Sequence, residues 1–458
     1  MSKLHPMKEI VESRRMGTPK GIYSACSANA YVIEACMEKA QAAGESVLIE
    51  ATANQVNQFG GYTGMKPADF SRFVYDIADK IGFPHERIIL GGDHLGPLTW
   101  KSETSQNAME KSIELIREYV LAGFTKIHLD TSMHLADDDT GKKLDTSVIA
   151  ERGAVLCKAA ETAFKEIMSL SDELQTPVYI VGSEVPIPGG SQKEGEGIQV
   201  TSVRDFEETV ETYKDTFFRF GLQSAWENVI AVVVQPGVEF GDETVHEYNR
   251  KAAAELCETL KKYPNLVFEG HSTDYQTPGA LKEMVEDGIA ILKVGPALTF
   301  ALREALFALN NMENELFKYD PGIQLSNLIE TLDTVMARNP DNWKKHYHGN
   351  PATIRYARKF SYSDRVRYYL PLPEVRESIE LMIQNLKTVE IPLTLIDQYL
   401  PLQYARIRSG KLKNDPEAMI KDRIGNYIDD YIYAITPKKS KTKGRYTYVE
   451  RNTLNFTS

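Results

Sequence analysis

The chain has 458 residues, 42% of them hydrophobic, and a formal net charge of −11 at pH 7. This length suits one large domain with an appendage, or two domains. The acidic balance disfavours nonspecific nucleic-acid binding, which needs a basic face. No apolar run is long enough to cross a bilayer, and the first residues lack the apolar stretch of a signal peptide. We therefore expect a cytoplasmic protein with neither a nucleic-acid nor a membrane partner.

Eight short apolar runs, most of them rich in β-branched residues, recur through the first two-thirds of the chain. Stretches with helical periodicity lie between the runs. Strand–helix alternation repeated eight times predicts a TIM (β/α)8 barrel. A doubly wound open sheet is the alternative fold, because periodicity does not prove closure. The predicted strands cover residues 21–24, 46–50, 87–90, 126–130, 178–181, 229–234, 266–269 and 290–294.

Beyond the eighth run the alternation stops and helical patterns follow, at 301–335, 374–390 and 416–434. We expect a barrel domain over residues 1–310 and a helical C-terminal extension over 311–458 that packs on it. The extension is a candidate contact surface for a homo-oligomer.

Three predicted strands end in metal-binding or acid–base residues. Asp93 and His94 follow the third strand, Glu184 the fifth and His271 the seventh. A parallel barrel brings the C-terminal ends of its strands to one mouth, and two imidazoles with a carboxylate are the usual protein share of a catalytic divalent-metal site. We therefore expect a metal site there, with Asp93 exchanging a proton with a substrate hydroxyl. Alternatively, Asp93 caps a helix and Glu184 forms a salt bridge at the rim.

The fourth predicted strand alternates so that His128 and Asp130 point to the same side. At the end of the strand, Asp130 would face the mouth, where it could bind a substrate hydroxyl or a metal. His128 would lie deeper, and we expect it to be a hydrogen-bonded interior histidine.

Small and polar residues after the seventh and eighth strands are candidates for binding a phosphate or sugar hydroxyls. These loops form the common phosphate site of such barrels, although the same residues suit a helix cap and turn equally well. The candidates are Ser272, Thr273, Asp274, Gly295 and Thr299.

Three further segments could complete a substrate pocket. Gln55 lies in an amide- and glycine-rich loop at 54–64, which suits a polyol ligand because amides both donate and accept hydrogen bonds. The glycine-rich stretch at 186–197 fits a mobile lid. Arg365, among aromatic residues at 361–369, could reach a phosphate, although such segments more often form an interface.

Seven stretches along nearly the whole chain carry a resemblance to a known family. They are GGDHLGP (91–97), HLDTSM (128–133), VGSEVP (181–186), VVVQPGVEF (232–240), FEGHSTDYQ (268–276), LKVGPALTFALREALFAL (292–309) and YSDRVRYYL (362–370). With them the chain resembles the GatZ/KbaZ family, known as the non-catalytic subunit of D-tagatose-1,6-bisphosphate aldolase. The family is similar in fold to the class II ketose-bisphosphate aldolases. Some members are reported as C4-epimerases of ketohexoses or their 6-phosphates.

The resemblance implies roles for individual residues. The implied catalytic residues are Asp93, Glu184 and Asp130. The implied ligands of a divalent metal (Zn, Mn, Ni or Co) are His94, Glu184, His271 and Gln235. At Gln235 the class II aldolases have a further metal histidine, so this residue would be a weaker ligand or a substrate contact.

The function that we favour from the sequence is a metal-dependent C4-epimerase that interconverts tagatose and fructose, free or as 6-phosphates. A C4–H bond in a ketose is not acidic, so we expect retro-aldol cleavage of the C3–C4 bond and re-addition to the other face of the aldehyde. One alternative is an accessory subunit that stabilises a separate aldolase catalytic subunit and does no chemistry of its own. Another is a class II aldolase acting on tagatose 1,6-bisphosphate, which the glutamine at position 235 argues against.

Overall fold

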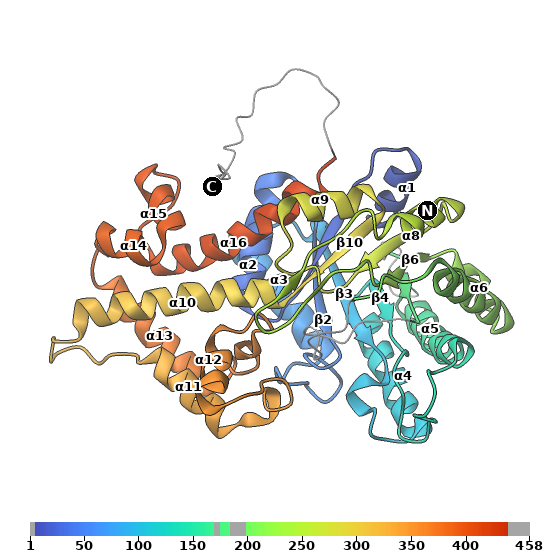
Figure 1. The fold of residues 1–458 in the computed structure, drawn as a ribbon, viewed down its shortest axis with the longest axis horizontal. Helices are drawn as coiled ribbons and strands as arrows, with labels where there is room; N and C mark the ends of the chain where they lie inside the picture. The colour runs from blue at the N-terminus through green and yellow to red at the C-terminus, as the bar shows by residue number, and fades with distance from the viewer. Residues whose placement is uncertain (1–4, 169–174, 184–197, 438–458) are drawn as a thin grey trace, which may run out of the picture.

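The computed structural model describes residues 5–168, 175–183 and 198–437. Eight parallel strands close into a barrel, which lies beside a group of C-terminal helices (Figure 1). Closure confirms the TIM barrel and excludes the open sheet. Glu184 and the predicted lid at 186–197 lie outside the described residues. In order around the barrel the strands are β1 (Ile22–Cys26), β2 (Val47–Thr52), β3 (Ile88–Leu95), β4 (Lys126–Leu129), β5 (Val178–Val181), β6 (Val229–Val234), β9 (Val267–Gly270) and β10 (Ile289–Val294).

All eight predicted strands form, and a short antiparallel pair that was not predicted follows β6. Its strands are β7 (Glu239–Phe240) and β8 (Val245–His246). The helices up to the last barrel strand are α1 (Lys8–Arg15), α2 (Ala30–Ala43), α3 (Pro67–Ile81), α4 (Ser105–Leu121), α5 (Thr146–Met168), α6 (Val203–Arg219), α7 (Gln223–Trp226), α8 (Ala254–Thr259) and α9 (Pro278–Glu286).

The interior of the barrel changes from apolar to charged along the strands. Toward the strand starts, inward-facing side chains such as Leu48, Val267 and Ile291 join an apolar cluster to which α1 also contributes. Side chains two positions apart on a strand point to the same face. Two positions after Leu48 comes Glu50, and two after Ile291 comes Lys293, both buried. The inner faces of the strands therefore carry an apolar layer below and a charged layer near the mouth.

The C-terminal helices pack on one side of the barrel (Figure 1). The last helix, α16, packs against α2, α9 and α10, so it ties the end of the described chain to the barrel. Position 310 falls inside α10, which belongs to both parts, and the division at that residue stays a prediction. The helices are α10 (Pro296–Phe317), α11 (Leu328–Arg338), α12 (Pro351–Phe360), α13 (Pro373–Lys387), α14 (Leu393–Tyr399), α15 (Pro401–Arg408) and α16 (Pro416–Ile435).

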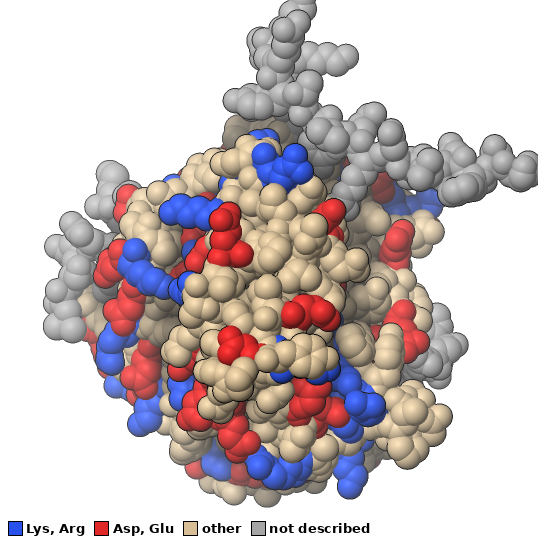
Figure 2. All heavy atoms as spheres, turned by 90° about the vertical axis from the view of Figure 1, so that its left-hand side faces the viewer, with Lys and Arg blue, Asp and Glu red and all other residues tan. Residues whose placement is uncertain are grey.

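The outer face of these C-terminal helices has a broad area with few charged side chains (Figure 2). Large hydrophobic side chains are exposed mainly in this part of the chain. They include Tyr319, Tyr356, Phe360, Val389, Leu393, Leu402 and Tyr433. Among the described helices, none combines the length and apolar character needed to cross a membrane.

Candidate active site

Asp93 and His94 are consecutive, yet both side chains line the same pocket at the barrel mouth. In a regular strand, neighbouring side chains point to opposite faces. Here the register between β3 and β4 shifts between Gly92 and Leu95, and His94 has the left-handed φ of 47°. For a residue other than glycine this conformation costs on the order of 1–3 kcal/mol, and such strain is concentrated at functional sites.

A buried network of charged side chains continues from Asp93 into the barrel. The Lys126 ammonium lies 2.8 Å from carboxylate oxygens of both Glu50 and Glu269. The Lys293 ammonium contacts Glu50 and lies 2.8 Å from Oδ1 of Asp93. All five side chains are buried. Charges at this depth are stable only when they are paired, and the two lysines pair with three carboxylates.

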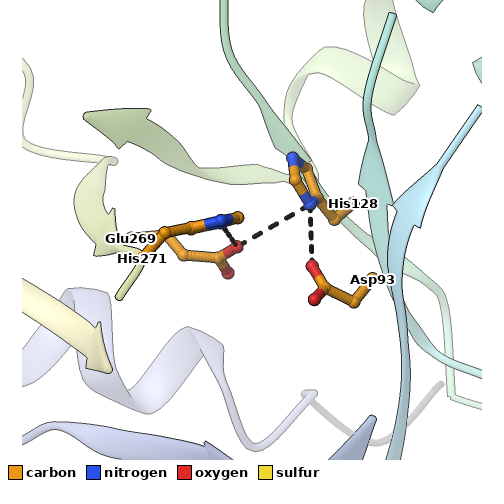
Figure 3. Close-up of side chains that lie close together, drawn as sticks. All are labelled: Asp93, His128, Glu269 and His271. Atoms are coloured by element: carbon orange, nitrogen blue, oxygen red, sulfur yellow. Dashed lines mark hydrogen bonds and ion pairs between the residues drawn. The ribbon is translucent and has the colours of Figure 1, made fainter. Parts of the chain in front are cut away.

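Three imidazoles lie beside this network, with ring centroids 4.9 to 5.2 Å apart. Each ring has one nitrogen at hydrogen-bond distance from a carboxylate. Nδ1 of His94 lies 2.7 Å from Asp130, and Nδ1 of His128 lies 3.0 Å from Asp93. Nε2 of His271 lies 2.9 Å from Glu269 on β9. Figure 3 shows the last two pairs converging from β3, β4 and β9. Histidines that bind metals are commonly oriented by such carboxylates, which leave the other nitrogen for the metal.

The electrostatics of the pocket keep Asp93 ionised. Burial raises the pKa of Asp93, but His94 and Lys293 outweigh that effect and hold the pKa well below its ordinary value. Burial lowers the pKa of His94, yet Asp93 and Asp130 more than offset this and raise it. Burial lowers the pKa of His271 to about 4, so this imidazole is neutral near pH 7 and able to bind a metal.

The cluster fits a divalent cation by charge and by donor type. Its four carboxylates, at Glu50, Asp93, Asp130 and Glu269, face two lysines. Two negative charges remain to be balanced, either by a cation or in part by a proton on His94, whose pKa is raised. Uncompensated buried charge is costly, and a divalent cation would balance it. Ligand atoms of Asp93, His128, Glu269 and His271 all lie within 4.8 Å of one another. Imidazole and carboxylate donors suit Zn²⁺, Mn²⁺, Ni²⁺ or Co²⁺.

The orientation of His128 supports this fit. Its Nδ1 atom lies 3.0 Å from a carboxylate oxygen of Asp93 and 4.0 Å from one of Glu269, so this nitrogen faces the other members of the group (Figure 3). His128 is therefore both the interior histidine that the sequence predicts and a candidate ligand that the sequence did not identify as one.

Two predicted site residues make other contacts in the described structure, and their predicted roles stay predictions. Gln235, expected near the metal, instead accepts hydrogen bonds from the backbone amides of Gly237 and Val238 through its Oε1 atom. It caps a turn after β6 and does not line the pocket. Asp130, expected to touch the substrate, does not line the pocket either; its carboxylate accepts hydrogen bonds from His94 and Ser132. Asp130 therefore positions His94.

The predicted substrate-binding residues divide into two groups. Gln55, Ser272, Asp274 and Gly295 line the pocket as expected. The other three, Thr273, Thr299 and Arg365, make hydrogen bonds to neighbouring parts of the protein. Thr273 donates to the backbone carbonyl of Lys293, and Thr299 donates to the carboxylate of Asp364. The guanidinium of Arg365 donates to the backbone carbonyl of Asn342 and to a ring nitrogen of His346.

Several pocket residues were not predicted. Tyr62, Arg367 and Tyr368 line the mouth, and Lys293 lies at its base. The sequence could have predicted that Lys293 points into the barrel, because side chains two positions apart on a strand share a face and Ile291 points inward. No comparable signal separates Arg367 from Arg365, since the segment has no regular period.

Comparison with known proteins agrees with this fold. The family model described as D-tagatose-1,6-bisphosphate aldolase subunit GatZ/KbaZ-like matches residues 7–436. Proteins named D-tagatose-1,6-bisphosphate aldolase subunit GatZ from Salmonella dublin and Salmonella gallinarum are each 49% identical over 431 residues, which is 94% of this chain and 99% of theirs. The crystal structure of a probable tagatose 6 phosphate kinase from Sinorhizobium meliloti 1021 has 45% identity and a TM-score of 0.82, over 91% of this chain and 100% of that one. The resemblance in the sequence is confirmed: the chain belongs to the GatZ/KbaZ-like family.

Proposed function

We propose that the protein is a subunit of a tagatose-bisphosphate aldolase and works with a separate catalytic subunit. The observation that carries this proposal is the 49% identity, over nearly the full length of both chains, to proteins named as that subunit. This agreement favours the accessory role over the epimerase.

The outer face of the C-terminal helices supports the same proposal. Leu393 on α14 and Leu402 on α15 are 40% and 42% exposed. The side of the molecule that the C-terminal helices form also has a broad area with few charged side chains (Figure 2). Large exposed apolar patches are typical of protein–protein contacts. We take this face as the contact surface for the catalytic subunit.

Co-purification tests the subunit role. The purified chain, mixed with a catalytic tagatose-bisphosphate aldolase subunit, should elute with it as one complex and slow its loss of activity on heating. Separate elution with unchanged aldolase stability would contradict the proposal.

A second candidate function, C4 epimerisation of a ketohexose or its 6-phosphate, is supported by a different observation. A subunit that only stabilises its partner has no use for a strained His94 and a buried cluster of three histidine–carboxylate pairs. Both features cost stability. They are understandable if the mouth performs chemistry of its own.

The chemistry follows from the positions of the side chains. Asp93, which contacts His128 and Lys293, would remove the proton from the C4 hydroxyl. The C4 oxygen then forms the carbonyl of an aldehyde, and the electron pair of the C3–C4 bond moves onto the C2–C3 unit as an enediolate. A divalent cation held by the cluster would supply Lewis-acid stabilisation of this negative charge. After rotation of the aldehyde, the reverse steps rebuild the bond and return the proton to oxygen.

Turnover by the purified chain alone decides between the two functions. After chelation and addition of Mn²⁺, Zn²⁺, Ni²⁺ or Co²⁺, an epimerase converts tagatose 6-phosphate into fructose 6-phosphate without accumulating trioses. Asp93→Asn should lower that rate by at least about 100-fold, because it removes the base. Trioses would indicate an aldolase, and no turnover with any of the metals would leave the subunit role alone.

A further inference from the structure

A second cavity lies on the C-terminal extension, apart from the barrel mouth. It has a volume of about 500 Å³, and among the described residues it shares none of its lining with the mouth pocket. Its walls come from α10, α12, the end of α14 and the turn between β7 and β8. Concave sites of about 300–1,000 Å³ are usual for specific binding, so this cavity is large enough to receive a ligand or a long side chain.

Aromatic side chains of the described chain form much of the lining of this cavity. Tyr356 and Phe360 on α12 are 48% and 42% exposed, and the centroids of their rings lie 5.4 Å apart. Aromatic residues are enriched at the centres of protein–protein contacts. The aromatic residues of the lining are Phe300, Phe307, Tyr356, Phe360, Tyr362 and Tyr399.

The charged groups in the described lining carry a net negative charge. Asp242, Glu243 and Glu304 contribute three carboxylates, whereas Arg303 is the one cation of this described lining. The guanidinium of Arg303 is buried, packs 4.1 Å from the ring centroid of Phe300 and lies 3.6 Å from a carboxylate oxygen of Asp364. Its charge is therefore already paired inside the protein, and the cavity favours a cationic ligand over an anionic one.

The three carboxylates differ in how far they are already bound. Glu304 forms an ion pair with Arg423 on α16. Asp242 interacts with Arg365, which offsets part of its charge. Glu243 is exposed and makes no ion pair with any residue that the structure describes. Glu243 is therefore the carboxylate of this cavity that is most available to a ligand.

The turn that carries this carboxylate is held in place by the segment after α12. The backbone amide of Tyr362 donates to the backbone carbonyl of Asp242 at 2.9 Å, and the hydroxyl of Ser361 donates to the carboxylate of Asp242 at 2.8 Å. These bonds fix the turn relative to the aromatic wall. A contact that is organised before binding loses little entropy when a partner arrives.

The cavity lies next to the face that we propose for the catalytic subunit. Tyr399, which lines the cavity, is the last residue of α14, and Leu393 on the outer face is the first. A helix of seven residues is about 10 Å long. α14 packs on α10 in the same group of C-terminal helices (Figure 1). A protein bound to the outer face would therefore reach the cavity.

We infer that this cavity receives an arginine side chain of the catalytic subunit. A guanidinium stacks on aromatic rings and pairs with a carboxylate, and the cavity offers both kinds of group. Arginine is also among the residues that contribute most to the affinity of protein–protein contacts. The inference rests on the proposed subunit role and adds the chemistry of the contact.

Affinity measurements on the full chain and a catalytic tagatose-bisphosphate aldolase subunit test the inference. Glu243→Lys should weaken the complex by at least about 10-fold, because it places like charges together. Tyr356→Ala should weaken it by about 10- to 100-fold, as expected for a residue at the centre of a contact. Both side chains are exposed, so both variants should fold, which circular dichroism checks. Calorimetric titration measures the dissociation constants.

Matched controls make similar changes on the barrel. Glu255→Lys on α8 reverses the charge of an exposed residue, and Phe218→Ala on α6 removes a ring that is 43% exposed. Neither should change the affinity.

Replacement of the surface arginines of the catalytic subunit by alanine, one at a time, tests the identity of the side chain. One of these variants should bind the unaltered chain more weakly but bind Glu243→Lys no more weakly than before, because the two residues act as a pair. If no arginine shows this coupling, the inference is wrong.

The outcomes separate this inference from the subunit role. Unchanged affinity in both Glu243→Lys and Tyr356→Ala would refute the cavity as a contact and leave the subunit role intact. A loss of affinity in Tyr356→Ala alone would refute the arginine and indicate an apolar side chain in its place. No association of the unaltered chain would refute both proposals.

Discussion

The barrel mouth and the outer face of the C-terminal helices depart from ordinary burial in opposite directions. At the mouth, Glu50, Lys126 and Glu269 are 0% exposed although they are charged. On the outer face, Leu393 and Leu402 are 40% and 42% exposed although they are apolar. Buried charged residues are rare unless they are paired, whereas single exposed leucines are common. The two regions are those that we propose for a small ligand and for a partner protein.

The largest expected effect comes from breaking the buried network. Lys126→Met leaves Glu50 and Glu269 without one of their cations and should destabilise the protein by about 3–5 kcal/mol. Urea unfolding measures this change. The matched control is Lys262→Met, which removes an exposed pair with Glu207 and should have little effect. Equal stability of the two variants would show that the network is not held by charge pairing.

A smaller loss of stability is expected from crowding the same network. Gly91 pairs with Glu50 across β2 and β3, and a Cβ atom on it would lie 2.6 Å from Cγ of Glu50. Gly91→Ala should cost about 1–3 kcal/mol, the range for overpacking. Gly279→Ala in α9, where a Cβ meets nothing within 4 Å, should be neutral or stabilising. Thermal unfolding of both variants checks the difference, and a fully stable Gly91→Ala variant would contradict the close packing at Glu50.

The positioning of His94 should affect metal binding more than stability. Asp130→Asn replaces the carboxylate 2.7 Å from Nδ1 of His94 and should weaken divalent-cation binding by about 10- to 100-fold. Calorimetric titration of the chelated protein with Zn²⁺ or Mn²⁺ measures the affinity. His94 lies beside the candidate ligand group of Asp93, His128, Glu269 and His271, and an unchanged affinity would show that metal binding does not depend on His94.

The outer face should affect association with the catalytic subunit and leave the fold almost unchanged. Leu393→Asp combined with Leu402→Asp should abolish co-elution with the catalytic subunit, because charge disfavours burial at a contact. Phe218→Asp on α6, which alters a side chain 43% exposed elsewhere on the barrel, is the control and should co-elute normally. Loss of co-elution in the control alone would place the contact on the barrel.

The sequence predicts the strands of this fold well because each is a short apolar run followed by a helical period. Closure was not predictable from period alone, since it depends on pairing between β1 and β10, which are distant in the chain. The pair β7 and β8 was missed because two-residue strands carry no pattern.

The candidate site was predictable where a polar residue follows an apolar run. Asp93 and His94 lie in the last part of β3, and His271 directly follows β9. The charged layer was missed, although the period of two marks Glu50 and Glu269 as inward-facing. A charged residue at an inward-facing position of an otherwise apolar strand is the signal that would have identified Glu50 and Glu269.

Other roles depend on contacts that a single sequence does not carry. Whether Asp274 binds a ligand or caps α10 depends on where its carboxylate lies relative to the amides of Gly295 and Ala297. Arg367 lines the pocket whereas Arg365 donates to Asn342 and His346, and the sequence around them carries no pattern that distinguishes the two. Gln235 forms a local turn, which its position after β6 does not reveal.

The central claim is that the buried charges at the mouth form a cation site. The most direct measurement is the metal content per chain by elemental analysis, after equilibration with Mn²⁺ or Zn²⁺ and removal of free metal. We predict one divalent cation per chain in the unaltered protein and loss of it in His271→Ala, with the fold verified by circular dichroism. Absence of stoichiometric metal in the unaltered protein, or equal metal in His271→Ala, would contradict the account.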